Sequence, residues 1–279
     1  MNPLVSVLMT AYNREDYIAE AIESVLDSTY LNFELIIVDD CSIDKTVDIV
    51  NFYAQKDDRI SVYLNDYNLG DYSNRNKAAS YAKGEYLMYV DSDDAINKDH
   101  IDKTIKVVNL WPDVKMVLPS RMHDKFFGSK NYSPHEAYHH HFFVDGFLET
   151  GPLGALIDRS VFFTLSGFSG RRMIGDVEFY LRLSREFQIA RIDSSTIRTR
   201  LGNPKESQIG EFFYLVEILE MYKKIIFDEL NPLYRRRYSL ILGKFIVLEF
   251  VIFKKFVKTF DFKYVLYFFK NVKYLFSYG

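Results

Sequence analysis

Short runs of aliphatic and β-branched residues alternate with amphipathic segments along the first ninety residues of this 279-residue chain. Such runs are typical of strands that are buried on both faces of a parallel sheet. They cover residues 4–10, 33–39, 59–64 and 85–90. Apolar residues recur at helical spacing between them. This order predicts an α/β fold with a doubly wound, mostly parallel, Rossmann-like sheet and right-handed crossovers.

The pattern is less regular after the fourth run. Val114 to Pro119 predicts a further strand, whereas residues 121–150, rich in His, Phe and Tyr, are expected to form an irregular substrate loop. Regular structure is expected to return at 152–157, followed by a helix beginning near Asp158, a helix from Asp176 to about Glu186 and a strand-like run at 188–192. Apolar stripes at helical spacing beyond residue 205 predict a helical C-terminal extension.

Charge is distributed unevenly along the chain. Residues 231–279 contain ten Lys or Arg residues and two acidic residues, a net charge of +8. Because the whole chain has a net charge of −3, the first 230 residues carry −11. An acidic main domain argues against nucleic-acid binding, and the basic, aromatic tail is expected to touch a membrane surface or form a homo-oligomer. With a single cysteine, Cys41, no internal disulfide forms, and a cytoplasmic location is expected, with peripheral membrane contact through the tail.

Acidic residues follow the predicted strands at the points where they end. The first run leads into Thr10 to Asn13, the second ends on Asp39 and Asp40, and the fourth leads into Asp91 to Asp94. Ligands of open α/β sheets bind beyond the carboxyl ends of the strands, so these carboxylates are expected on one rim, neutralised by a divalent cation. The chain has no phosphate-binding P-loop and no dinucleotide fingerprint. Side chains and a metal ion must therefore hold any phosphates.

Four segments in order carry a specific resemblance. Residues 5–14, 38–42, 84–94 and 174–183 are similar to the motifs of family-two glycosyltransferases with the GT-A fold, nucleotide-diphospho-sugar transferases such as those of bacterial polysaccharide synthesis. The resemblance covers roughly residues 3–200. It implies a catalytic domain at 1–204, with a nucleotide-binding half at 1–115 and an acceptor-binding half at 116–204, followed by the tail at 205–279.

The resemblance also implies roles for individual residues on the donor side. The donor nucleotide would be bound by Thr10, Ala11, Tyr12, Asp39, Arg75 and Asp91. In that arrangement Tyr12 stacks on the base and Asp39 accepts a base N–H, which fits a UDP-sugar. Asp93 would be the carboxylate that ligates Mn²⁺ or Mg²⁺ on the diphosphate.

Asp176 matches the catalytic base of the family. It would take the proton of an acceptor hydroxyl as that oxygen displaces the nucleotide, which inverts the anomeric centre. The acceptor implied is a glycan or a lipid-linked sugar of a bacterial surface polysaccharide. Because Asp176 opens a predicted helix, the helix N-terminus is expected to keep the carboxylate ionised. Glu178 lies close by and is the alternative base.

The chain departs from the family pattern at two points. Thr10 stands where many relatives have Pro, a change that the backbone contact at this position should tolerate. No histidine occurs at residues 198–203, where relatives often place one near the donor phosphates. Arg198, Arg200 and Asn203 are the residues here that could reach the diphosphate instead.

Simpler interpretations remain open for several polar residues. Asp40 and Asp94 are as well suited to capping turns as to binding a ligand. Three consecutive histidines at 139–141 in an extended loop cannot converge on one ion, so they are expected to be surface or acceptor contacts. Cys41 is expected to be a small packed side chain.

Two other functions use a similar sheet. A sugar-phosphate nucleotidyltransferase would need a Gly-rich, basic signature after the first strand, which Thr10 to Arg14 lacks. A non-enzymatic nucleotide-binding or signalling module, with Asp39, Asp40 and Asp91 as a phospho-acceptor pocket, would need a lysine after a late strand. Lys115 is poorly placed for that role.

Overall fold

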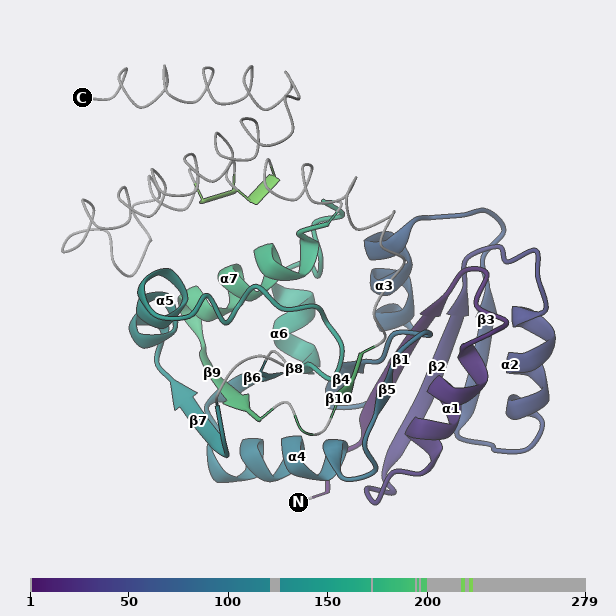
Figure 1. The fold of residues 1–279 in the computed structure, drawn as a ribbon, viewed down its shortest axis with the longest axis horizontal. Coiled ribbons are helices and arrows are strands. Elements are labelled where there is room, and N and C mark those ends of the chain that lie inside the picture. Colours follow the sequence, from purple (N-terminus) through teal and green to yellow (C-terminus); the bar gives the residue numbers. More distant parts are fainter. Residues whose placement is uncertain are drawn as a thin grey trace, which may run out of the picture. The chain divides into compact units, whose positions relative to one another are not determined.

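The computed structural model describes residues 2–120, 126–171, 173–193, 195, 197–199, 217–218 and 221–222 (Figure 1). The chain divides into two compact units. The first comprises Met1–Ala137 and Phe147–Leu201, and the second comprises Tyr138–Gly146 and Gly202–Gly279.

An eight-stranded sheet forms the centre of the first unit. Its strand order is β3-β2-β1-β4-β8-β6-β9-β7. The strands are β1 (Val5–Ala11), β2 (Phe33–Asp39), β3 (Ile60–Leu64), β4 (Tyr86–Tyr89), β6 (Val114–Pro119), β7 (Ser129–Tyr132), β8 (Leu156–Asp158) and β9 (Gln188–Ile192). β8 runs antiparallel to both neighbours and β7 antiparallel to β9, so the other six strands share one direction. The doubly wound, mostly parallel sheet predicted from the sequence is confirmed.

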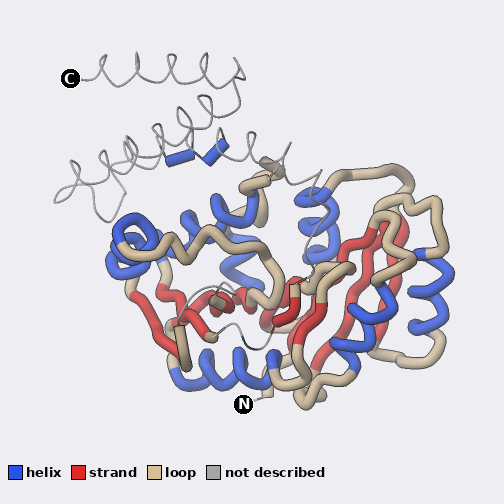
Figure 2. The backbone as a smooth tube through the Cα atoms, in the orientation of Figure 1, coloured by secondary structure: helices blue, strands red, loops and turns tan. Residues whose placement is uncertain are grey.

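Helices cover both faces of this sheet (Figures 1 and 2). Alternate residues of β1 point to opposite faces, so Val5, Val7 and Met9 pack in one core with α1 (Ile18–Leu26), α2 (Thr46–Ala54) and α4 (His100–Leu110). The other face is covered by α3 (Asp71–Ser80), α6 (Arg159–Thr164) and α7 (Gly175–Glu186), where Tyr89 of β4 packs against the Phe162 ring. Burial on both faces explains the continuous apolar runs of the strands.

The region expected to be an irregular loop contains regular structure instead. Besides β7, it holds the helix α5 (Pro134–Phe143), so the prediction of an extended loop around the three histidines was wrong. The helix starts at a capping box: Glu136 N–H reaches the Ser133 hydroxyl, while the Glu136 carboxylate accepts from Ser133 N–H at 2.9 Å. Pro134 occupies the first helical position, which suits its fixed φ.

Two smaller features belong to the first unit. α3 begins at Asp71, directly after Gly70, which adopts φ +81° and allows the chain to turn into the helix. A two-stranded antiparallel sheet, β5 (Ala95–Ile96) with β10 (Ile197–Arg198), was not predicted. β10 brings Arg198 to within 4.0 Å of Glu20, while Arg200 and Asn203 lie outside the described residues.

The second unit is described in part. Within it the Tyr222 hydroxyl lies 2.9 Å from His141 Nε2, and the Tyr222 ring packs against Phe142. Ile218 and Met221 are buried in the same region. Most of the tail at 205–279 lies outside the described residues, as do the two interpretations offered for it. Within the described part of the chain, no helix combines the length and the apolar character needed to cross a membrane.

Candidate active site

A cavity of about 540 Å³ opens beyond the carboxyl ends of β1, β2 and β4. β1 and β2 pair in register, so they end side by side at Ala11 and Asp39, and β4 flanks β1 on its other side. The cavity is lined by Thr10, Ala11, Tyr12, Arg14, Asp40, Asn68, Gly70, Asp71, Asn74, Arg75, Asp91, Ser92 and Asp93. All seven residues expected at a donor and metal site lie in this unit, and six of them line this cavity: Thr10, Ala11, Tyr12, Arg75, Asp91 and Asp93.

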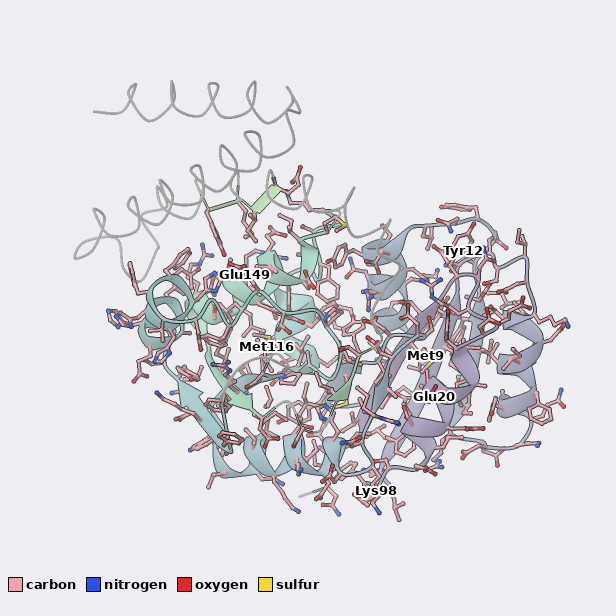
Figure 3. The ribbon with its side chains drawn as sticks, in the orientation of Figure 1. Met9, Tyr12, Glu20, Lys98, Met116 and Glu149 are labelled. Atoms are coloured by element: carbon pink, nitrogen blue, oxygen red, sulfur yellow. The ribbon has the colours of Figure 1, made fainter. Side chains whose placement is uncertain are left out.

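Hydrogen bonds join the loop after β1 to the loop after β2 beside the cavity. Asn13 N–H donates to the Ser42 hydroxyl at 2.8 Å, and Ile43 N–H donates to the Asn13 side-chain oxygen at 2.9 Å. Asn13 adopts φ +53°, a conformation that asparagine tolerates better than most residues. This turn leaves the Tyr12 ring 46% exposed beyond the end of β1 (Figure 3), where a planar group can stack on it.

Asp39, the residue expected to accept a base N–H, lies at the end of β2 opposite Ala11, which lines the cavity. The Asp39 side chain is buried, and its two oxygens accept hydrogen bonds from the Ser42 hydroxyl and the Ser42 N–H. Asp40 lines the cavity wall. Its carboxylate accepts from Leu69 N–H at 2.8 Å and Gly70 N–H at 2.9 Å, which holds the loop that leads into α3. The capping interpretation of Asp40 is therefore supported.

Arg75 joins two carboxylates on the opposite wall. Its guanidinium lies 2.7 Å from Asp71 on the same helix and 2.7 Å from Asp91 after β4. Burial of this group lowers its pKa, but the attraction of Asp91 and Asp71 outweighs burial and raises the pKa above its ordinary value. Arg75 is thus a permanent cation inside the cavity, and it fixes the position of the Asp91 carboxylate.

Asp93 is the more accessible carboxylate of the Asp-Ser-Asp segment. Its side chain is 42% exposed, and its nearest cation is Arg14 at 3.5 Å. Among the described residues no group of three or more His, Cys, Asp or Glu side chains is arranged to hold a metal ion. This donor set fits a Mg²⁺- or Mn²⁺-type ion that is bound by one or two carboxylates and completes its coordination with substrate phosphates and water.

Asp176 lies at the second position of α7, and it is only 7% exposed. Its Oδ1 accepts hydrogen bonds from the Tyr72 hydroxyl at 2.9 Å and from Val177 N–H at 2.8 Å. Burial raises the pKa of Asp176 to about 6, although Val177 N–H, the Tyr72 hydroxyl and nearby Arg75 all lower it. Desolvation has a larger effect on this pKa than the hydrogen bonds and the positive charge that favour the ionised form. A pKa of about 6 still leaves the group mostly ionised at neutral pH.

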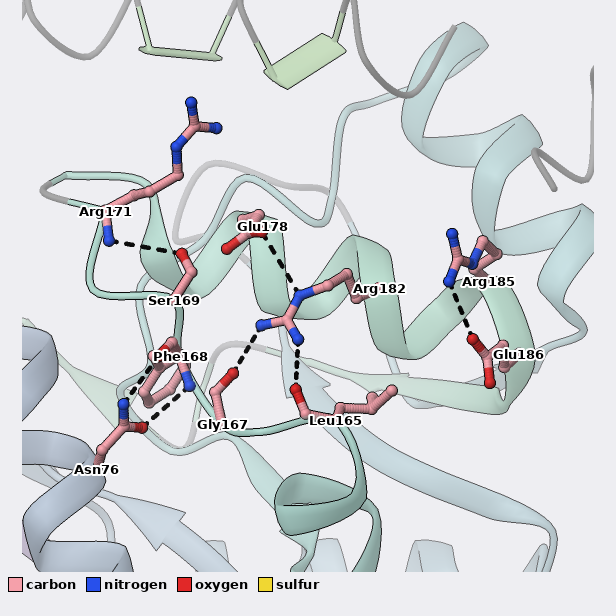
Figure 4. A network of polar contacts seen from close by, with 10 residues as sticks. All are labelled: Asn76, Leu165, Gly167, Phe168, Ser169, Arg171, Glu178, Arg182, Arg185 and Glu186. Atoms are coloured by element: carbon pink, nitrogen blue, oxygen red, sulfur yellow. Dashed lines mark hydrogen bonds and ion pairs between the residues drawn. The ribbon is translucent and has the colours of Figure 1, made fainter. Parts of the chain in front are cut away.

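Glu178, the alternative base, belongs to a polar network that anchors the loop between α6 and α7 (Figure 4). Its carboxylate lies 3.6 Å from the Arg182 guanidinium, which donates to the carbonyls of Leu165 and Gly167 in the loop between α6 and α7. From the other side, Asn76 of α3 forms two hydrogen bonds with the backbone of Phe168. The loop that leads to Asp176 is thus held by both helices.

The sequence interpretation did not assign roles to Arg14, Asp71 and Tyr72. Arg14 sits inside a recognised segment, and its place after the first strand could have indicated that it faces the cavity. Tyr72 carried no comparable signal, since its contact with Asp176 joins residues 104 positions apart.

A family model for glycosyl transferase family 2 matches residues 6–180, from β1 into α7. This range covers well over half of the chain and includes the cavity and Asp176. The chain belongs to glycosyltransferase family 2.

Two curated relatives are similar over a little more than a third of this family-2 chain. The putative teichuronic acid biosynthesis glycosyltransferase TuaG of Bacillus subtilis is 45% identical over 104 residues, covering 37% of this chain and 41% of TuaG. The Escherichia coli UDP-Glc:alpha-D-GlcNAc-diphosphoundecaprenol beta-1,3-glucosyltransferase WfaP is 44% identical over 110 residues, covering 37% of this chain and 43% of WfaP. The match thus spans about two fifths of the length of these relatives.

Solved structures show that the fold extends further than this sequence similarity. Staphylococcus aureus TarS 1-349 in complex with UDP-GlcNAc superimposes with a TM-score of 0.73 at 20% identity, covering 95% of this chain and 78% of TarS 1-349. The mannosyltransferase PcManGT of Pyrobaculum calidifontis, in complex with GDP-Man and Mn²⁺, gives 0.64 at 15% identity, covering 97% and 80%. The GT-A fold expected from the sequence is confirmed.

Proposed function

We propose that this family-2 protein transfers a sugar from a UDP-sugar to a hydroxyl group of a glycan or lipid-linked acceptor, with inversion at the anomeric carbon. The observation that carries the proposal is the cavity beyond β1, β2 and β4, with Tyr12 at its mouth, Arg75 and Asp91 in its wall, and the buried base Asp176 close enough to Arg75 to respond to its charge. Membership of family 2 supports it independently.

The donor side of the cavity suits a nucleoside diphosphate. Tyr12 offers an exposed ring for the base beside Thr10 and Ala11, and the Asp91 carboxylate is held by Arg75 at a place where it can accept from ribose hydroxyls. Asp39 is proposed to accept a base N–H, and its hydrogen bonds with Ser42 hold its carboxylate in place. UDP-GlcNAc in TarS and UDP-Glc in the name of WfaP support a uridine donor.

A divalent cation completes the proposed site. Asp93, the more exposed carboxylate of the Asp-Ser-Asp segment, would hold Mn²⁺ or Mg²⁺, and Arg14 is its present counter-charge. Such an ion would neutralise the charge that develops on the leaving nucleotide. The Mn²⁺ complex of PcManGT supports this assignment.

Asp176 is proposed to take the proton from the acceptor hydroxyl as its oxygen attacks the sugar. Its pKa of about 6 suits a base that works near neutral pH, since it is ionised there yet more basic than an ordinary aspartate. Glu178 is less suited, because it faces Arg182 in the loop anchor. A signalling pocket is disfavoured, because Lys115 lies at the start of β6 and pairs with Asp158 at 3.2 Å.

The acceptor is proposed to be a growing glycan or a sugar on a lipid carrier. The names of TuaG and WfaP support this class, the first through teichuronic acid synthesis and the second through a sugar-diphosphoundecaprenol acceptor. The acceptor-binding half includes α7 and the loop held by Asn76 and Arg182.

The direct experiment is release of UDP from UDP-glucose and UDP-GlcNAc by the full chain with Mn²⁺, with and without GlcNAc-diphosphoundecaprenol. Asp176→Asn is expected to bind UDP as the wild type does but to lose about 100- to 10,000-fold in transfer, because only the base is removed. Asp102→Asn, on α4, is the matched control and should retain activity. Substantial transfer by Asp176→Asn would reject the base, and no UDP release by the wild type from either donor would reject the proposed reaction with them.

A further inference from the structure

Tyr72 of α3 reaches across to α7 and donates its hydroxyl hydrogen bond to Asp176 Oδ1 at 2.9 Å. We propose that Tyr72 is a positioning residue that holds Oδ1 of the base, so that Oδ2 is the oxygen that receives the proton of the acceptor hydroxyl. The proposal rests on the proposed role of Asp176 and adds to it a second residue and a choice between the two carboxylate oxygens.

The two oxygens of Asp176 have different surroundings. Oδ1 accepts both the Tyr72 hydroxyl and Val177 N–H, which uses both of its lone pairs. Oδ2 accepts no side-chain hydrogen bond from the described part of the chain. Because Asp176 keeps 7% of its surface exposed, Oδ2 is the oxygen left for an incoming hydroxyl group.

Packing fixes the Tyr72 ring in the place that this hydrogen bond requires. A Cβ on Gly175 would lie 2.9 Å from three carbon atoms of the ring, so the ring can lie against the start of α7 only because this residue is glycine. The ring also contacts Phe168, with centroids 5.4 Å apart, and Phe168 is itself held by Asn76. Tyr72 is 7% exposed, so few other positions are open to it.

Tyr72 acts as a donor over the whole pH range of interest. Its burial, reinforced by the charge of Asp176, raises the pKa of the Tyr72 hydroxyl well above its ordinary value. The hydroxyl therefore stays protonated, and its proton points to the carboxylate rather than away from it.

The other charged or titratable groups around Asp176 come from three elements. Arg75 of α3 lowers the pKa of Asp176. Among the described residues, the others are Asp91 after β4, which pairs with Arg75, and Tyr180 of α7, which is fully buried beside Asp176. Arg75 and Tyr72 are three residues apart on one helix, so α3 holds the donor wall and the base together.

Removal of the Tyr72 hydroxyl should change the pKa of Asp176 in a predictable direction. The hydrogen bond stabilises the ionised form of Asp176, so its removal raises the pKa of the carboxyl group and lowers the fraction of active base at a given pH below that pKa. A hydrogen bond to a charged group corresponds to about one pH unit, or about a tenfold loss of rate on the acid side. A packing role without the hydrogen bond would lower the rate equally at every pH.

The first measurement needs no substrate. The full chain is labelled with ¹³C at aspartate side-chain carboxyl carbons, Asp176 is assigned by the signal that Asp176→Asn removes, and its chemical shift is followed between pH 4 and 9. Tyr72→Phe is expected to move the midpoint upward by about one pH unit. Tyr30→Phe is the matched control, because Tyr30 is similarly buried and its hydroxyl donates to Pro3 O on the other face of the sheet. An unmoved midpoint in Tyr72→Phe would overturn the proposal.

A second variant keeps the test decisive if Tyr72→Phe folds poorly. Gly175→Ala retains the Tyr72 hydroxyl group but displaces the ring that carries it. This variant should therefore raise the Asp176 midpoint as well. The pH profile of UDP release from UDP-glucose should show its acid limb shifted by the same amount in Tyr72→Phe. If Asp176→Asn is inactive and that limb does not move, the positioning role fails while the base stands; if Asp176→Asn is active, the proposed base itself fails.

Discussion

Burial of Asp176 lowers the free energy of unfolding at neutral pH. Folding buries this carboxyl group and raises its pKa from 3.8 to about 6, so the folded state disfavours the ionised form. Below pH 4 the group is protonated in the folded and the unfolded chain, and the penalty is absent. As the pH rises from 4 through 6, the unfolded chain releases the proton more readily, so the free energy of unfolding falls. Above pH 6 the full penalty applies.

Asp176→Asn should therefore make the protein more stable at pH 7.5. The amide oxygen of asparagine can still accept from Tyr72 and Val177, while the buried charge is gone. The expected gain is on the order of 2 kcal/mol at pH 7.5, and it should vanish near pH 4. Urea denaturation of both proteins at the two pH values measures it. A variant that is less stable than the wild type at pH 7.5 would show that the charge is not penalised.

Tyr72 shows why part of the site could not be predicted from the sequence. Asp91 and Asp93 were predicted at the site because parallel strands end at one rim and because the motif spacing is specific, whereas Arg75 was assigned from the family resemblance alone. The partner of Asp176 depends on how α3 and α7 meet in three dimensions, which no local pattern encodes. The two hydrogen bonds of Asp39 with Ser42 were not predicted for a related reason, because only the structure reveals the turn that forms them.

Helix α3 connects the elements of the site. It carries Arg75 toward the cavity, Tyr72 toward Asp176 and Asn76 toward the loop between α6 and α7. The Asn76 amide acts like a short piece of backbone, since it donates to Phe168 O at 2.8 Å and accepts from Phe168 N–H at 3.0 Å. The loop before Asp176 thus takes its position from α3.

Asn76→Ala should loosen this loop. It leaves the backbone N–H and C=O of Phe168 without their partners, which is expected to lower the free energy of unfolding by about 1–3 kcal/mol and to reduce transfer. Ser80→Ala on the same helix is the control, because its exposed hydroxyl bonds only within α3 and its loss should change stability by at most about 0.5 kcal/mol. Thermal unfolding of the three proteins measures the effect, and equal melting temperatures would contradict the anchoring role.

Elements differed in how well the sequence predicted them. The first four strands were predicted because their apolar runs are buried on both faces, and α1 was predicted because it shows a clear apolar stripe. α5 was missed because its aromatic and histidine-rich sequence has no apolar stripe, although the Ser133 to Glu136 capping box marks its start. The antiparallel direction of β8 was also not predicted, because the strand is only three residues long and its pairing with β4 and β6 is set by the tertiary fold.

The charge of the whole molecule bears directly on the proposed donor. The first 230 residues carry −11, and the cavity is lined by four aspartates against Arg14 and Arg75. A nucleoside diphosphate is itself strongly anionic, so it would enter a negative field without a neutralising ion. A divalent cation held by Asp93 is therefore expected to contribute a large part of the affinity for the donor.

The measurement that tests this claim most directly is calorimetric titration of the full chain with UDP, in the presence and absence of Mn²⁺, with GDP, CDP and dTDP for comparison. UDP should bind best, and Mn²⁺ should strengthen its binding by at least about tenfold in the wild type and in the control Asp102→Ala, but not in Asp93→Ala. Equal UDP affinity with and without Mn²⁺, or an unchanged effect of Mn²⁺ in Asp93→Ala, would contradict the metal site. Failure of every nucleotide to bind would contradict the donor cavity itself.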